Sequence, residues 1–506
     1  MGGCLASPQP DPSEEQDEEF PSSRSPRCVA FQLEQNGKRL YLRYSPGGGG
    51  NRRSTLRLNG DSVASPYTRF YVEPSREHDG LVHVRCCYDN RYWVAQQRPD
   101  DGSSVVGAAD EAEEDLTKTS CTLFRITRGA HPRFVRLLHV HLEKYACLPA
   151  SSDNMPKLEA VNLSLLKGDD VIDSYTIQDL SQQVVLPRYL AFKCDKGRYL
   201  RARRQERHFY LEFSGRDIRD EAVLNTVNTN DDGTIRVRSN YVGKFWRRSP
   251  NWIWADCSGD DVGAGDDTLF RAIRFGGFFA LQNLGNDYFC KRLTTDGKRN
   301  CLNAGTPTIT AEARLQLEEA VVSREIYNVV FDISQARIYG KIVVNLGGTA
   351  SAVNGTTSNN TAKLTLEYTD KEKRTWDSKV TMKLGVADTT ICTGVPVIVS
   401  DATVEVSAEF TGSYSWGSSV EKETTQKVAY EVAVPPKTRV TVASMATKAS
   451  CDVPFSYTQR DTLVNGLQVT YDMDDGLYTG VNHYDFKYVT GEKKVSEMDS
   501  NAVSSL

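Results

Sequence analysis

Alternation of apolar and polar residues marks the stretch from Trp376 to Trp416. In its second half, apolar side chains occupy every second position from Val404 to Phe410, with polar residues between them. In its first half, residues 379–386 alternate in the same way. Because successive side chains of a strand point to opposite faces, each half is predicted to be a strand with one apolar and one polar face.

A turn signal separates the two halves, at Pro396 within the apolar run 395–399. Folding the halves antiparallel about Pro396 pairs apolar with apolar residues on one face and opposite charges on the other. The predicted pairs are Met382–Phe410, Leu384–Ala408, Val386–Val406 and Lys383–Glu409. Taken alone, this pattern favours an ordinary amphipathic hairpin of a soluble β-sandwich.

The same hairpin also has the length to cross a bilayer, which takes about ten residues of tilted strand. A lone hairpin cannot do so, because its edge backbone groups would lack partners in lipid, so several chains would have to close a β-barrel. In that case the lipid-facing residues would be Val380, Met382, Leu384, Val386, Val404, Val406, Ala408 and Phe410, with Pro396 near the tip. The pore-lumen residues would be Lys379, Lys383, Glu405 and Glu409.

A threefold repeat organises residues 26–180. The segment 38–42 recurs as 90–94 and again as 143–147, with a period a little over fifty residues. A closing strand recurs with it, at 70–72, 124–126 and 175–177. Three copies of short strands joined by Gly, Asp and Asn turns predict a β-trefoil.

Residues 186–320 repeat this scheme, and they predict a second β-trefoil. The recurring segments are 197–200, 243–246 and 286–289. Residues 321–506 instead carry long alternating runs of Val, Thr, Ser and Lys, which are typical of long, half-exposed strands. Residues 1–25 are acidic and rich in Pro and Ser, and are predicted to be a disordered tail. The fold class is therefore all-β, with two trefoils followed by an elongated β domain that contains the hairpin 376–416.

Composition agrees with a multidomain globular protein. The chain has 506 residues, of which 25% are charged and 39% are apolar, which suits three domains. The sequence contains no run of eighteen apolar residues, so no membrane-spanning helix is predicted. A net charge of −5 argues against general nucleic-acid binding.

The cysteines and the N-terminus favour a cytoplasmic protein. The twelve cysteines are scattered without CxxC spacing, so we expect reduced thiols. No secretory signal opens the chain, since residues 11–19 are mostly acidic. Gly2 and Cys4 are candidate sites of myristoylation and palmitoylation, which would anchor the chain to a membrane. Ala6 stands where the acylation pattern calls for Ser or Thr.

Several runs carry a family resemblance. The segments 245–256, 279–286 and 301–305 resemble the amaranthin-type agglutinin domain, and Val434-Pro435-Pro436 with 451–457 resembles the aerolysin-type pore-forming module. The whole chain is similar to plant chimerolectins that join the two, a group that includes wheat proteins induced by insect feeding. The resemblance implies trefoils that bind galactose or N-acetylgalactosamine glycans, a homo-oligomer and a membrane-inserted pore. With that context, we expect the hairpin to insert.

Sugar binding needs an aromatic face beside amides and charges. Candidates in the first trefoil are Asn90, Tyr92, Trp93 and Gln96, and in the second Trp246, Asn251 and Trp252. A tryptophan that recurs at one position of a repeat is also a natural core residue, which favours a structural role for Trp246.

Other functions have less support. The aerolysin-like part would be only an oligomerisation scaffold if no pore forms. An enzyme is not expected, because no nucleophile–base motif appears and His139 and His141 lack a third metal ligand, so neither a metal nor a cofactor is predicted. Five arginines, Arg198, Arg201, Arg203, Arg204 and Arg207, would meet anionic lipid or glycans, or simply form a solvated basic face.

Overall fold

The structure is a computed structural model. It describes residues 27–35, 38–47, 54–97, 103–129, 131, 133–149, 159–161, 171–172, 174–259, 262–386, 388–407, 412–414 and 416–495. The predicted acylation sites Gly2 and Cys4, and the hairpin residues Ala408, Glu409 and Phe410, lie outside these ranges. Within them the chain is built of strands with short 3₁₀ turns, as the all-β prediction requires. No helix of the described ranges has the length and apolar character needed to span a bilayer.

The first sheet forms a closed barrel with three hairpins. Its strands are β1 (Arg27–Gln35), β2 (Lys38–Ser45), β3 (Thr55–Gly60), β4 (Phe70–Pro74), β5 (Leu81–Cys86), β6 (Tyr92–Gln97), β7 (Ser103–Ala109), β8 (Leu123–Arg128), β9 (Val135–His139), β10 (Lys144–Pro149), β11 (Glu159–Val161), β12 (Val171–Ile172) and β13 (Thr176–Asp179). β1 pairs with β4 and β13, β5 pairs with β4 and β8, and β8 pairs with β9. Val135 bridges to Tyr175, which closes the ring.

The second sheet repeats this arrangement. Its strands are β14 (Tyr189–Lys193), β15 (Tyr199–Gln205), β16 (His208–Gly215), β17 (Asn225–Thr229), β18 (Ile235–Ser239), β19 (Lys244–Ser249), β20 (Trp252–Cys257), β21 (Phe270–Phe275), β22 (Phe278–Asn283), β23 (Phe289–Thr295), β24 (Lys298–Thr306) and β25 (Gln316–Glu319). The ring runs through β14, β17, β18, β21, β22 and β25, and the other strands form three hairpins. Both sheets are therefore β-trefoils, and the recurring segments of the sequence fall at equivalent strands.

Large aromatic side chains fill the centre of each trefoil. Trp93 contacts Phe31, Phe70 and Phe124, with ring centroids 5.1–6.0 Å apart. Trp246 occupies the equivalent place in the second trefoil, 5.1 Å from Phe192 and 6.1 Å from Phe270. Both tryptophans are fully buried.

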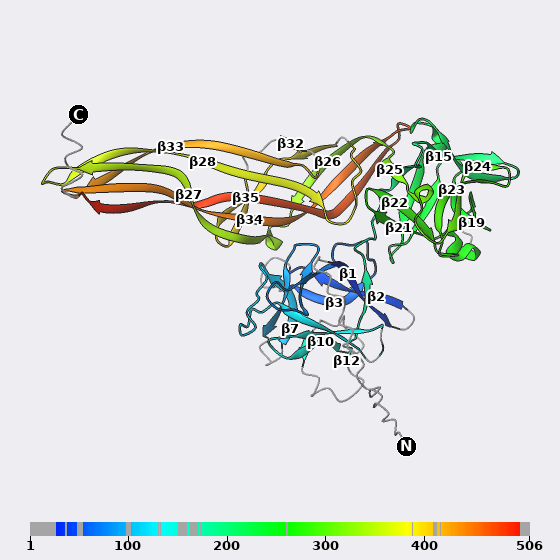
Figure 1. Ribbon diagram of the computed structural model, residues 1–506, viewed down its shortest axis with the longest axis horizontal. Coiled ribbons are helices and arrows are strands. Elements are labelled where there is room, and N and C mark those ends of the chain that lie inside the picture. The colour runs from blue at the N-terminus through cyan, green and yellow to red at the C-terminus, as the bar shows by residue number, and fades with distance from the viewer. Residues whose placement is uncertain are drawn as a thin grey trace, which may run out of the picture.

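The third domain is a long rod (Figure 1). Its strands are β26 (Val321–Phe331), β27 (Arg337–Asn354), β28 (Asn360–Ser378), β29 (Asp388–Cys392), β30 (Val395–Ser400), β31 (Thr403–Ser407), β32 (Gly412–Tyr414), β33 (Ser419–Val434), β34 (Thr438–Leu463) and β35 (Gln468–Lys494). The main sheet has the order β32-β29-β26-β34-β35-β28-β33, and β27 also pairs with β34. β34 has 26 residues, so it spans about 85 Å. In the figure the second trefoil lies at one end of the rod, and the first trefoil lies beneath the half of the rod nearer that end.

The predicted strand over 379–386 is wrong. These residues, which we call the strap, form only a single bridge, between Val185 and Thr381. Their alternation serves another purpose, because the apolar Met382 and Leu384 pack against the core of the second trefoil.

The predicted register about Pro396 is also wrong. β30 and β31 form a two-stranded hairpin, the stowed hairpin, in which Pro396 lies opposite Val406 and Ile398 lies opposite Val404. Its turn is at Asp401 and Ala402, five residues after the predicted turn. The physical reason is that the run 395–398 lies within a strand and not in a turn, because Val395 and Ile398 are buried in the core of the rod.

Candidate functional site

The strap lies where all three domains meet. Lys379 Nζ donates a hydrogen bond to Asn90 Oδ1 of the first trefoil, over 3.1 Å. The Met382 amide donates to the Val185 carbonyl, in the segment between the trefoils, over 3.0 Å. The Leu384 amide donates to Glu319 Oε1, at the end of the second trefoil, over 2.8 Å. Moving the strap would therefore break contacts with every domain.

Glu319 itself belongs to a buried ion cluster at the base of the rod. Arg324 of β26 pairs with Glu319 and, through Nε, with Asp461 of β34 over 2.7 Å. All three side chains are almost completely buried. Since removing one partner would leave a buried charge uncompensated, this cluster fixes the second trefoil to the rod.

Two lysines predicted to line a pore are half-buried in this conformation. Lys383 Nζ donates to Gln459 Oε1 over 2.8 Å and lies 5.3 Å from the centroid of the Trp416 ring. Burial lowers the pKa of Lys379 and of Lys383, and nearby Arg324 lowers that of Lys383 further. A lowered lysine pKa means that the charge is less stable here than in water. The two lysines therefore oppose the stowed position of the strap.

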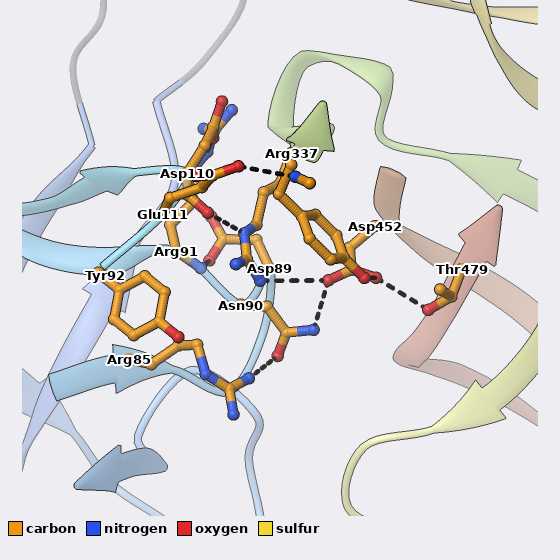
Figure 2. Close-up of polar contacts among 12 residues, drawn as sticks. Arg85, Asp89, Asn90, Arg91, Tyr92, Asp110, Glu111, Arg337, Asp452 and Thr479 are labelled. Carbon is orange, nitrogen blue, oxygen red and sulfur yellow. Dashed lines mark hydrogen bonds and ion pairs between the residues drawn. The ribbon is translucent and has the colours of Figure 1, made fainter. Parts of the chain in front are cut away.

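The first trefoil is held to the rod by Asp452 of β34. Figure 2 shows Asn90, Arg337 and Thr479 converging on this carboxylate. Asn90 Nδ2 donates over 2.7 Å, the Thr479 hydroxyl donates over 2.8 Å and Arg337 Nη1 donates over 3.4 Å. Asp452 is 2% exposed, so its charge depends on these donors.

This network changes the role of two predicted sugar-binding residues. Asn90 is buried between the first trefoil and the rod, and its oxygen accepts from Arg85 and Lys379. The Tyr92 hydroxyl donates to Glu73 over 2.9 Å, and Arg337 lies 5.4 Å from the centre of the Tyr92 ring. In this structure Asn90 joins two domains and does not face a glycan.

The stowed hairpin lies against the rod through one side chain in particular. Asn482 of β35 accepts from the Ile398 amide over 3.0 Å and donates to the Ile398 carbonyl over 2.9 Å. Val395, Ile398 and Val404 point into the core, whereas Val399 and Val406 are 44% and 46% exposed. The hairpin is thus half-covered, and its exposed part carries these two valines beside polar residues. Of the other predicted hairpin residues, Pro396 is buried, Val380 and Val386 are half-buried and Glu405 is exposed.

The remaining sugar-site candidates divide into core and surface residues. Trp93 and Trp246 are corrected to core residues, because both are 0% exposed at the trefoil centres. Gln96 is half-buried on β6. Trp252 is half-buried and Asn251 is exposed, so these two remain accessible.

Two further polar side chains stand beside Asn251. Asn286 Nδ2 lies 3.3 Å from Asn251 Oδ1, and Arg248 Nη1 lies 3.4 Å from the same atom. Trp252 packs edge-to-face against Tyr210 at 6.1 Å. The two amides and the guanidinium suit the hydroxyls of a sugar, while the neighbouring Trp252 ring packs toward Tyr210 of β16. Asn286 and Arg248 were not among the candidates predicted from sequence, although Asn286 lies in the repeated segment 286–289.

The histidines considered for metal binding have other partners. His139 Nε2 lies 3.1 Å from the Cys121 carbonyl oxygen, and His141 Nδ1 lies 2.9 Å from the Leu116 carbonyl oxygen. Burial lowers the pKa of His139 to about 4. Among the residues of known placement, no group of three or more His, Cys, Asp or Glu is arranged to hold a metal ion.

Comparison with known proteins gives one family. The model of the agglutinin domain matches residues 25–155 and 184–319, which together make up more than half of the chain. No curated protein matches the chain.

Among solved structures, a lamprey immune protein is 13% identical, with 71% of this chain and 87% of that chain covered at a TM-score of 0.28. A mosquitocidal holotoxin is 10% identical, with 62% of this chain and 36% of that chain covered at a TM-score of 0.27. An aerolysin-like protein of Bombina maxima is 12% identical, with 34% of this chain and 99% of that chain covered at a TM-score of 0.23. TM-scores this low do not establish a shared fold.

Proposed function

The chain belongs to the agglutinin-domain family, and from this premise we propose that it is a carbohydrate-binding protein whose third domain forms membrane pores. The trefoils would hold the chain at a glycan-bearing surface, with galactose or N-acetylgalactosamine as the expected sugars. Shallow lectin sites are weak singly and gain strength by multivalency, so two trefoils in each subunit of a homo-oligomer suit this task.

One observation carries the pore proposal. β28 and β33 pair without a shift from Asn360–Val434 to Thr375–Ser419, and the described part of the chain between them forms the strap, β29, the stowed hairpin and β32. Continuing the same ladder would place Leu384 opposite Phe410 and Val386 opposite Ala408. This register differs by two residues from the one predicted from sequence. Since side chains alternate with a period of two, the same residues would still share the apolar face.

The energetics favour such a rearrangement only in an assembly. At about 1.5–3 kcal/mol for each large apolar side chain, the lipid-facing row would supply roughly ten kcal/mol per subunit before ordering costs. Lys379 and Lys383 would leave their half-buried positions and face the lumen, with Glu405 and Glu409. Ring closure remains necessary, because unpaired strand edges are not tolerated in lipid.

On the glycan side, Trp252, Asn251, Asn286 and Arg248 of the second trefoil make the best-supported site. Each hydrogen bond to a sugar hydroxyl nets only about 1 kcal/mol. We therefore expect millimolar affinity for a single site, and stronger binding by an oligomer on a glycolipid surface.

A glycan array combined with dye release from glycolipid vesicles tests the proposal. Phe410→Asp should abolish dye release and leave glycan binding unchanged, because it puts a charge on the lipid face. Phe410→Leu is the matched control and should retain release. If Phe410→Asp releases dye at the wild-type rate, the insertion segment is misassigned.

A lectin whose third domain is only an oligomerisation scaffold is the second candidate. The anchoring of the strap favours it, because the backbone hydrogen bonds of Met382 and Leu384 and the packing of their side chains on the second trefoil resist release. Vesicle leakage separates the two functions: a scaffold would bind glycans and oligomerise without releasing dye.

A further inference from the structure

A hollow of about 820 Å³ opens between two hairpins of the second trefoil, β15–β16 and β23–β24. We call it the basic hollow. It is lined by Lys196, Arg198, Arg203, Arg204, Gln205, Glu212, Phe213, Ser214, Arg216, Gly297, Arg299 and Asn300. This volume lies within the range of about 300–1,000 Å³ typical of small-ligand sites.

The lining is strongly positive although the whole chain has a net charge of −5. Six cations face one carboxylate, Glu212, which already pairs with Arg203 over 2.9 Å. Arg198, Arg204, Arg216 and Arg299 are exposed, and none has an ion pair within 4.0 Å among the residues that the structure describes. Four exposed guanidinium groups thus line the basic hollow without an ion pair to any described residue.

The neighbouring arginines are arranged differently, which sets the basic hollow apart from an ordinary solvated face. Arg292 makes two 2.8 Å bonds to Asp195, and Arg201 lies 3.4 Å from Asp220. Both of these arginines thus have a carboxylate partner. In the basic hollow the domain supplies Ser214, Asn300 and Gln205 instead, which are neutral groups that can bond to hydroxyls.

The shape and lining also limit the class of ligand. The only aromatic lining residue, Phe213, is 2% exposed, so the basic hollow lacks the stacking surface that single-stranded nucleic acids use. Its position between two hairpins suits an extended chain better than the flat surface of a bilayer. Arginine forks match planar carboxylates and sulfate oxygens with paired hydrogen bonds.

We propose that the basic hollow binds an acidic oligosaccharide, whose sulfate or carboxylate groups meet the four unpaired arginines and whose hydroxyls meet Ser214 and Asn300. This site is distinct from the neutral-sugar site around Trp252, and it rests on the proposed carbohydrate-binding function. The trefoil would then read two features of one glycan-bearing surface, its neutral sugars and its acidic groups.

Calorimetric titration of the full chain with a heparin tetrasaccharide tests the proposal. Arg204→Gln/Arg299→Gln should weaken binding at least about tenfold, since hydrogen bonds to charged groups are worth more than neutral ones. The control is Arg219→Gln/Arg274→Gln, which removes the same charge from two exposed arginines of the same domain outside the basic hollow. The control should bind within about twofold of wild type, because distant exposed charges are screened.

Equal losses in both double variants, or no loss in the first, would overturn the site. Tighter binding to phosphatidylserine vesicles or to an oligothymidine than to the tetrasaccharide would overturn the ligand class. The same proteins on an array of neutral glycans separate this inference from the proposed function. Binding to the tetrasaccharide without binding to neutral galactosyl glycans would refute the proposed sugar specificity and keep the basic hollow as a site.

Discussion

Replacing Asn482 by alanine should loosen the stowed hairpin, because this one side chain bonds to both backbone polar groups of Ile398. The two hydrogen bonds measure 3.0 and 2.9 Å, and Ile398 is 2% exposed. In Asn482→Ala both backbone groups would be left without that partner in a site with little access to water. An unsatisfied buried group costs about 1–3 kcal/mol.

Taking about 2 kcal/mol for the pair, the opening equilibrium of the hairpin should rise about 30-fold. Two measurements can monitor this opening equilibrium. Hydrogen exchange of residues 395–407 by mass spectrometry should accelerate by that factor, whether or not a membrane is present. If hairpin opening limits insertion, dye release from vesicles should accelerate in the same variant.

Asn354→Ala provides the matched control. Asn354 is also buried, and it donates to the carbonyls of Ser358 and Val434 over 2.7 and 2.8 Å at the turn between β27 and β28. It should destabilise the rod without accelerating exchange at 395–407. Unchanged exchange of the hairpin in Asn482→Ala, or equal acceleration in Asn354→Ala, would refute the claim that Asn482 holds the hairpin.

Three further substitutions test the trefoils. Trp252→Ala should reduce binding to neutral glycans at least tenfold on an array without lowering the melting temperature of the chain. Trp246→Ala should lower the melting temperature markedly, since replacing a buried tryptophan by alanine costs about 3–5 kcal/mol. Asp89→Asn tests a buried carboxyl: burial raises the pKa of Asp89 to about 6 from 3.8, although neighbouring Arg91 lowers it. Between these values the folded protein binds a proton that the unfolded chain releases, so the free energy of unfolding of wild type should rise relative to the variant as the pH falls from 7 to 4. If the difference in free energy of unfolding between wild type and Asp89→Asn stays constant from pH 7 to 4, the raised pKa of Asp89 is contradicted.

The trefoils could be predicted from sequence because each repeat carries its own local signals. A strand, a turn and an aromatic recur three times, and the structure places the copies at equivalent positions around each barrel. The same symmetry explains the error at Trp93 and the structural role that the sequence favoured for Trp246. A residue at the centre of a threefold barrel is surrounded by all three repeats, so its aromatic ring belongs to the core.

The strap could not be predicted from its own alternation. Its apolar residues have partners in a trefoil that lies more than sixty positions earlier in the chain, and Lys383 has partners in β34. Periodicity reports only that alternate side chains need an apolar contact, and it does not report which surface supplies it. The turn of the stowed hairpin was misplaced for a related reason: Pro396 occupies a strand whose neighbours are buried by the rod.

The position of the strap also limits what can trigger its release. A ligand shifts a conformational equilibrium only by its difference in affinity for the two states. None of the hydrogen bonds described for the strap involves Asn251 or Trp252, so a glycan at that surface would not favour the released strap directly. Glycan binding would act by raising the local concentration of the chain, and contacts between subunits would have to supply the differential free energy. Release should accordingly depend steeply on the surface density of bound protein and weakly on the identity of the neutral sugar.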